Sequence, residues 1–327
     1  MNSRWESILQ TALRTPSPHN TQPWRVRVTS DRSATLFMDV ARTLPDEDTT
    51  GHFLICAMGM FLESLRIVSA NAGVALQHTL IDQRGPGPLI RFAELVLDGP
   101  SEASPYPDHL FEIRKTSRLP NNSVRISPAL TAQLKELAPR YGQHYHQFED
   151  PALIERIVLE NIRAVFNDLN VPAYHREIAR WFRYSDKEAQ TKADGLDYRC
   201  MRILPMQLRL MRSLPQIMRW PLTRGLIKRI YRRQLGEISH LGVISGPFFD
   251  DVAAIDAGAF LMRFWLELSR CRLFIHPFGN LVTNPEAKAR VRQMTRIDDV
   301  WLVFRVGYTD EPPQSFRRPL NEVLIHD

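Results

Sequence analysis

The chain has 327 residues, of which 44% are hydrophobic and 24% charged, a composition typical of a globular protein. Three widely separated cysteines without a C-x-x-C spacing argue against a disulfide scaffold and against structural zinc, and they favour a reducing compartment. The longest apolar run, FLICAMGMFL at 53–62, has ten residues, well below the ~20 that span a bilayer. We therefore expect a cytoplasmic protein without a signal peptide.

Helical and strand patterns alternate along the chain. A capping box, Ser3-x-x-Glu6, begins a helix that Pro16 and Pro18 end, and the apolar alternation in 24–30 then predicts a strand. Further helices are predicted at 53–73, 127–142, 151–168, 173–184 and 254–270, and further strands at 88–99, 240–246 and 300–308. Because helices separate the strands, the fold mixes α and β structure.

Two of the predicted helices have similar sequences. GMFLESLRIVSANAGV at 59–74 and GAFLMRFWLELSRCRL at 258–273 both begin G-x-F-L and continue as apolar helices of one length. Strand-like sequence follows each of them. This pattern indicates two related halves, although two unrelated core helices could also produce it.

The positive charge is concentrated in one segment. The net charge is +6, and residues 201–236 alone contain eight arginines, one lysine and no acidic residue. A general nucleic-acid-binding surface is therefore not required, and we expect no nucleic-acid partner. The segment is also rich in Met and Leu, which fits a membrane-surface element, a mobile lid over a pocket, or helices with a solvated arginine face. Three prolines interrupt it, so we favour the lid or the solvated helices over a membrane contact.

The loop PSPHNTQPW at 16–24 carries an unusual number of hydrogen-bonding side chains. Ser17, Asn20 and Gln22 offer donors and acceptors on a backbone that three prolines stiffen. Such a loop could present fixed hydrogen bonds to a flat heteroaromatic ligand. The other interpretation is a turn that caps its own backbone.

Two basic motifs suit an anion. RKTSR at 114–118 places Thr116 between Arg114 and Arg118, and FRRPLNEVL at 316–324 carries Arg317 and Arg318 on a tail whose apolar residues predict packing against the body. Each arginine pair also fits a solvated surface. His144 and His146 have no third ligand at a convincing spacing, so no metal site is predicted.

These motifs together resemble those of the nitroreductase superfamily. PSPHNTQPW resembles its P-S-x-x-N-x-Q-P-W loop, RKTSRLP is similar to its R-x-S-x-R/K phosphate motif with Thr116 in place of Ser, and RVGY with RRPLNEVL is similar to its closing strand and basic tail. The resemblance is greatest to the Acg-like branch, in which two nitroreductase-like halves are fused in one chain. It covers residues 5–324, and the first motif is the most specific.

The resemblance implies an α+β fold with a central sheet flanked by helices. It implies a single domain, 1–327, built of two pseudo-symmetric halves at approximately 1–113 and 114–327, with one FMN held between them. The implied FMN contacts are Arg114, Thr116 and Arg118 at the phosphate and ribityl chain, Pro16, Ser17, Asn20 and Gln22 at the ring, Pro277, Phe278 and Gly279 at the ring edge, and Arg317 or Arg318 at the phosphate.

The implied function is an FMN-dependent oxidoreductase that passes hydride from NAD(P)H through FMN to an electron-poor organic acceptor of the nitro, quinone or enone type. The hydride step from the nicotinamide needs no catalytic acid or base, so none is assigned. The alternative is a catalytically idle protein that sequesters or stores FMN under a cover. The residues leave open which small molecule is the acceptor and whether the protein is a monomer or a homodimer.

Overall fold

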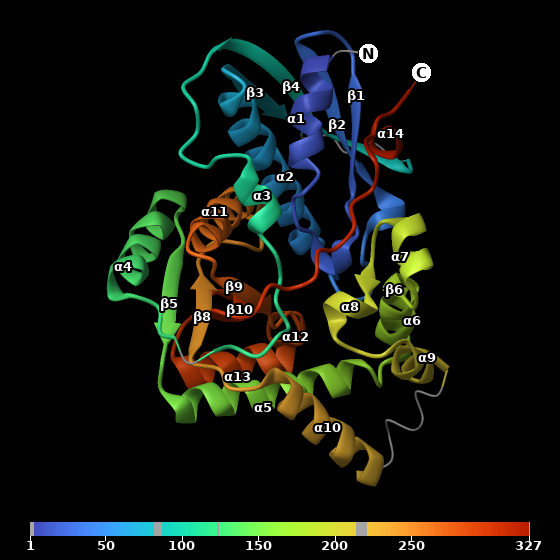
Figure 1. Ribbon diagram of the computed structural model, residues 1–327, viewed down its shortest axis with the longest axis vertical. Coiled ribbons are helices and arrows are strands. Elements are labelled where there is room, and N and C mark those ends of the chain that lie inside the picture. The colour runs from blue at the N-terminus through green and yellow to red at the C-terminus, as the bar shows by residue number, and fades with distance from the viewer. Residues whose placement is uncertain (1–2, 82–86, 123, 214–220, 327) are drawn as a thin grey trace.

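Two four-stranded antiparallel sheets form the framework of the protein (Figure 1). The computed structural model describes residues 3–81, 87–122, 124–213 and 221–326. The first sheet consists of β1 (Trp24–Val28), β2 (Ser33–Asp39), β3 (Val74–Leu80) and β4 (Leu89–Pro100). The second consists of β5 (His144–Phe148), β8 (His240–Ser245), β9 (Phe274–Pro277) and β10 (Val300–Gly307). The short strands β6 (Phe182–Arg183) and β7 (Leu196–Asp197) form a separate parallel pair.

Helices cover these sheets and lie between them. The α-helices in the first half of the chain are α1 (Ser3–Ala12), α2 (His52–Asn71), α3 (His109–Ile113), α4 (Pro128–Leu137) and α5 (Pro151–Asp168). The later ones are α6 (Pro172–Trp181), α7 (Asp186–Lys192), α8 (Tyr198–Met201), α9 (Pro205–Ser213), α10 (Pro221–Leu235), α11 (Asp251–Arg270), α12 (Asn280–Thr283), α13 (Pro285–Thr295) and α14 (Leu320–Val323). The 3-10 helices are η1 (Pro18–Asn20), η2 (Val40–Arg42) and η3 (Ala138–Tyr141).

The structure confirms the α+β class and the helices and strands predicted from periodicity. The helix predicted at 173–184 is the one clear boundary error, because α6 ends at Trp181 and the chain continues as β6. The basic segment forms α8 in part, α9 and α10, and its residues 214–220 lie outside the described ranges. The tail packs back on the body as predicted, since Leu324 bridges to Val26 of β1.

The prediction of one central sheet is wrong, because the structure has two sheets with the same topology. Their strand orders are β1-β2-β4-β3 and β5-β8-β10-β9, and in each case one long helix, α2 or α11, connects the second strand to the third. Among the described residues each strand ladder stays within one sheet, and the packing of α2 against α11 is the most extensive contact between the two units. The first sheet lies within 1–113 and the second within 114–327, while the exact division into halves remains a prediction.

The helices α2 and α11 cross between the two sheets at very short distance (Figure 1). A Cβ atom built on Gly59 would lie 2.3 Å from the carbonyl oxygen of Ile255, and one on Gly258 would lie 2.2 Å from that of Cys56. These are the glycines of the two G-x-F-L motifs. The crossing therefore requires glycine on both helices, and the largest cluster of buried side chains surrounds it.

Helix α2 is apolar along most of its length. Among the described helices, α2 alone is long and apolar enough to cross a membrane. However, 83% of its apolar stretch is buried inside the protein. Its composition is accounted for by its place in the core.

Replacing Gly258 by alanine is expected to lower the free energy of unfolding by roughly 2 kcal/mol or more, because a methyl group must push two helix backbones apart. Urea denaturation followed by circular dichroism measures this change. Gly225→Ala on α10 is the control, since nothing lies within 4 Å of its Cβ position. It is expected to be neutral or to stabilise by up to ~1 kcal/mol. Equal losses in both variants would contradict the crossing argument.

Candidate functional site

The loop at 16–23 is held in a defined turn. His19, Asn20 and Gln22 have φ values of 48°, 53° and 52°, in the left-handed region that few residues other than glycine adopt. The Ser17 hydroxyl accepts a hydrogen bond of 2.9 Å from the backbone N–H of Gln22. The turn-capping interpretation of Ser17 therefore describes this side chain, and the neighbouring Pro16 is half-buried.

Gln22 and Arg318 fasten the loop to other parts of the chain. The fully buried Gln22 side chain donates to the carbonyl oxygen of Ala193 at 2.9 Å and accepts from the backbone N–H of Arg318 at 2.8 Å. Arg318 in turn donates to the carbonyl oxygens of Gln22 and Glu322 at 3.3 and 2.6 Å. The amide of Gln22 is thus engaged within the protein, and Arg318 faces the tail.

Arginines from three parts of the chain converge beside this loop. Arg114 and Arg317 both donate to the carbonyl oxygen of Arg14, at 2.6 and 3.2 Å, and Arg317 also donates to the Asn20 side chain at 2.9 Å. Among the described residues, the carboxylate that pairs with this cluster belongs to Glu112, whose side chain is 61% exposed and lies 3.2 Å from Arg14. The positive charge of this cluster therefore greatly exceeds the negative charge around it.

Burial makes the charged forms of Arg114 and Arg317 energetically unfavourable. Arg114 is 4% exposed, and burial together with repulsion from Arg317 and Arg14 lowers its pKa well below the ordinary value. Burial and the charge of Arg14 lower the pKa of Arg317 to about 9. Within the described residues the Nε atoms of both side chains are buried without a hydrogen-bond acceptor. An anion with several oxygens would supply both the missing charge and the missing acceptors.

The segment 114–118 is extended, so its alternate side chains share one face. Arg114 ends α3 with ψ 107°, and Thr116 forms a bridge to Ile275 of β9. Arg114, Thr116 and Arg118 therefore line one side of an extended segment. Arg118 donates to the carbonyl oxygen of Cys200 at 3.1 Å.

The residues predicted at the ring edge, 277–279, lie at the end of β9, the strand to which Thr116 bridges. Pro277 ends β9, Phe278 is buried and Gly279 is exposed. The ring of His276 lies 5.3 Å from that of Phe278, and burial with the charges of Arg118 and Arg305 lowers its pKa well below the ordinary value. Arg118 therefore lies near this turn, Thr116 bridges to β9, and Arg114 and Arg317 meet at the carbonyl oxygen of Arg14 beside the loop. That these segments form one cofactor site stays a prediction.

Residues 193–202, which the sequence analysis did not assign to the site, cover the loop. Gly195 donates its N–H to the carbonyl oxygen of Asn20 at 3.2 Å, and the carbonyl oxygens of Ala193 and Cys200 accept from Gln22 and Arg118. The segment 201–236 was predicted to be a lid or a solvated surface element, and this choice stays a prediction. Arg202 of that segment donates to the carbonyl oxygen of Arg118 at 3.0 Å.

An acidic cluster lies on the other side of the loop. The His19 Nε2 atom is 3.1 Å from a carboxyl oxygen of Glu47, and Glu177 accepts the backbone N–H groups of Asp46 and Glu47 at 3.1 and 2.8 Å. Neither His19 nor Glu47 was predicted as a site residue. Arg14 was not predicted as a site residue either, although its position two residues before the PSPHN motif could have indicated it.

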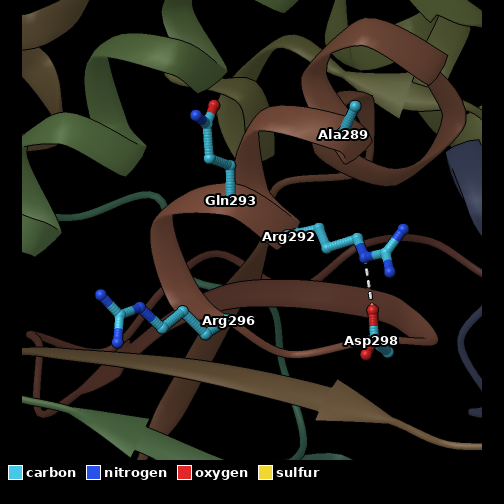
Figure 2. A pocket seen from close by; sticks show the side chains of 5 residues that line it. All are labelled: Ala289, Arg292, Gln293, Arg296 and Asp298. Atoms are coloured by element: carbon cyan, nitrogen blue, oxygen red, sulfur yellow. Dashed lines mark ion pairs between the residues drawn. The ribbon is translucent and has the colours of Figure 1, made fainter.

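A surface pocket of about 410 Å³ lies on α13, away from these residues (Figure 2). Ala289, Arg292, Gln293, Arg296 and Asp298 line it. Arg292 pairs with Asp298 there, and Arg296 points away from the pair. None of the predicted cofactor residues lines this pocket, so we assign the site from the arginine cluster. Among the residues that the structure describes, no group of three His, Cys, Asp or Glu side chains is arranged to hold a metal ion.

Comparison with known proteins gives distant relatives. No protein-family model matches the chain. It is 24% identical to the uncharacterised protein Rv3127 of Mycobacterium tuberculosis over 326 residues, covering 96% of this chain and 90% of that one. It is 38% identical to the putative NAD(P)H nitroreductase acg of the same organism over 68 residues, 21% of this chain and 20% of that one. The predicted resemblance to nitroreductases is confirmed.

Solved structures of nitroreductases are also similar to this nitroreductase-like chain. The FMN-dependent nitroreductase NfnB from Mycobacterium smegmatis, in complex with NADPH, is 15% identical with a TM-score of 0.43, covering 67% of this chain and 97% of that one. A nitroreductase with bound FMN from Bacteroides fragilis is 12% identical with a TM-score of 0.35, covering 64% and 92%.

Inorganic phosphate is expected to stabilise the flavin-free protein through the arginine cluster. At a hundred times its dissociation constant a ligand adds about 2.7 kcal/mol to the free energy of unfolding, which corresponds to roughly 4 °C in a chain of this size. Thermal unfolding with and without phosphate measures the shift. Arg317→Gln should remove most of it, whereas Arg32→Gln, at a side chain that is 64% exposed, should not. The same shift in both variants would show that phosphate acts elsewhere.

Proposed function

We propose that the protein binds FMN between the loop at 16–23 and the segments 114–118 and 277–279, and that it passes hydride from NAD(P)H through FMN to an electron-poor organic acceptor. The observation that carries the proposal is the convergence of Arg14, Arg114 and Arg317 beside the loop. The confirmed resemblance to nitroreductases supports the cofactor, and the name of the acg relative supports a nicotinamide donor.

The residues would bind FMN in one orientation, with its phosphate at Arg114 and Arg317 and its ring toward the turn 277–279. Arg114 and Arg317 would hold the phosphate, because their buried Nε atoms lack acceptors within the described residues. Thr116 and Arg118 continue along the same face of the extended segment toward His276 and the turn 277–279. The charge of Arg118 there would stabilise negative charge on the ring. When bound, FMN supplies the two-electron chemistry, and the protein supplies position and electrostatics.

Gln22 and Arg318 would act by shaping the loop, since their polar groups already bind other parts of the chain. Asn20 would remain between ring and phosphate, because its side chain donates to the carbonyl oxygen of Phe316 at 3.1 Å and accepts from Arg317. The other predicted ring contacts, Pro16 and Ser17, flank this position.

A second candidate function is sequestration of FMN without turnover. The contacts of residues 193–202 with Gln22, Asn20 and Arg118 favour it, because a covered ring would exclude NAD(P)H. The two functions differ in whether the donor reaches the ring, which a reduction experiment decides.

The purified protein is expected to show the visible absorption of oxidised FMN and to lose it when NADPH is added anaerobically. The reason is that hydride transfer removes the chromophore of the oxidised ring. Absorbance that persists with NADPH and with NADH would favour sequestration. A protein that neither retains FMN nor takes it up would contradict both functions.

Arg114→Ala combined with Arg118→Ala is expected to abolish FMN retention, because each charge-assisted bond to the cofactor is worth roughly 1.5–3 kcal/mol. Flavin content per protein after gel filtration measures it. Arg125→Ala removes a charge from a side chain that is 80% exposed and should leave flavin content unchanged. Full flavin content in the double variant would refute the phosphate assignment.

A further inference from the structure

His19 occupies a position between opposite charges in the loop. Its Nε2 atom faces the carboxyl group of Glu47 at 3.1 Å, and both side chains are 19% exposed. The charge of Arg118 also acts on this imidazole. The other ring nitrogen, Nδ1, is buried and has no hydrogen-bond partner within the described residues.

Glu47 is surrounded by other acids. Glu177 of α6 accepts the backbone N–H groups of Asp46 and Glu47, and Asp168 of α5 also acts on Glu47. Burial, followed by the charges of Glu177, Asp168 and Asp46, raises the pKa of Glu47 to about 8. The Glu47 carboxyl group is therefore largely protonated at neutral pH.

His19 is neutral at the same pH. Burial lowers its pKa to about 4, and the charge of Arg118 adds to this effect while that of Glu177 opposes it. A protonated carboxyl group beside a neutral imidazole donates its O–H to Nε2, and the imidazole proton then sits on Nδ1. The pair thus presents a buried N–H donor that has no acceptor within the described part of the chain.

A buried donor without an acceptor needs an explanation, because leaving one unpaired costs free energy. Nδ1 belongs to the loop that we assign to the ring of FMN, and the acceptor of the proposed reaction must approach that ring. Reduction of a conjugated acceptor by two electrons requires a hydride and a proton. The proposed function supplies the hydride and leaves the source of the proton open.

We propose that Glu47 and His19 form a proton relay to the electron acceptor. This inference rests on the proposed function. The hydride adds to one end of the acceptor's conjugated system, and the Nδ1 proton of His19 adds to the other end. At the same time the Glu47 O–H passes its proton to Nε2, so the imidazole changes tautomer without gaining charge. Glu47 is left as a carboxylate. Once the product leaves, a proton from solvent reaches Nδ1 and Nε2 returns its proton to Glu47, which restores the starting tautomer.

Two variants isolate the relay while preserving the local structure. Gln in Glu47→Gln still donates to Nε2 and cannot release a proton. Asn in His19→Asn suits the positive φ of this position and cannot relay one. The control Glu286→Gln changes a side chain that is 71% exposed.

Stopped-flow reoxidation of the NADPH-reduced protein separates proton from electron transfer. With a cyclic enone, both variants are expected to react about 100-fold more slowly than wild type, in the range typical of general acid catalysis. With ferricyanide, which takes electrons and no proton, wild type and variants are expected to react alike. The enone rate of wild type should fall as the pH rises through about 8, the pKa of Glu47, and that of Glu47→Gln should not.

The flavin-free protein provides an independent readout. Infrared spectroscopy at pH 7 is expected to show a protonated carboxyl band that Glu47→Gln removes and Glu286→Gln retains. No such loss would overturn the relay, as would wild-type enone rates in variants that retain FMN and are reduced by NADPH. Failure of the proposed function itself is distinct, because then the wild-type protein would not bind FMN or would not be reduced.

Discussion

The near contact of α2 and α11 at Gly59 and Gly258 is the constraint on which the site depends, because each helix holds one wall of it. Thr15, at the start of the loop, is fully buried and donates to the Ser64 hydroxyl of α2 at 2.7 Å. The guanidinium of Arg114 lies 4.8 Å over the Trp265 ring of α11. Any separation of the two helices would therefore separate the loop from the first arginine of the segment 114–118. Two glycines far from the arginines thus fix the spacing of the cationic cluster.

Buried guanidinium groups near the predicted site donate to backbone carbonyl oxygens instead of carboxylates. Arg305, 2% exposed, donates to the carbonyl oxygens of Leu235, Ser117 and Leu119 at 2.7 to 3.0 Å. A carbonyl oxygen satisfies the N–H geometry and leaves the positive charge uncancelled, whereas a carboxylate would cancel it. The surroundings of these arginines therefore keep a positive potential that a cofactor phosphate would neutralise. The uncancelled charge lowers the free energy of unfolding of the ligand-free protein.

The sequence was informative wherever a pattern is local. Periodicity predicted α2, α11 and the strands β1, β4, β8 and β10. Motif resemblance pointed to the segments at 16–24, 114–118 and 316–324. What it did not predict are partnerships between distant residues, such as Gln22 with Arg318 and Ala193, since one sequence carries no signal for contacts across 296 or 171 positions. The single central sheet was implied by the resemblance, and the strand patterns could not correct it, because they show that strands exist and not which strands pair.

Glu47 shows why some functional candidates escape sequence reasoning altogether. The acids that act on it come from α5, α6 and its own turn. No sequence spacing predicts that Asp168 and Glu177 lie near Glu47. The same folding brings Arg118 close enough for its charge to help keep the imidazole of His19 neutral. The neighbouring acids thus hold a proton on Glu47, while the positive charge of Arg118 disfavours one on His19. In the proposed relay the imidazole therefore lies on the route of a proton from the partly exposed carboxyl group to the electron acceptor.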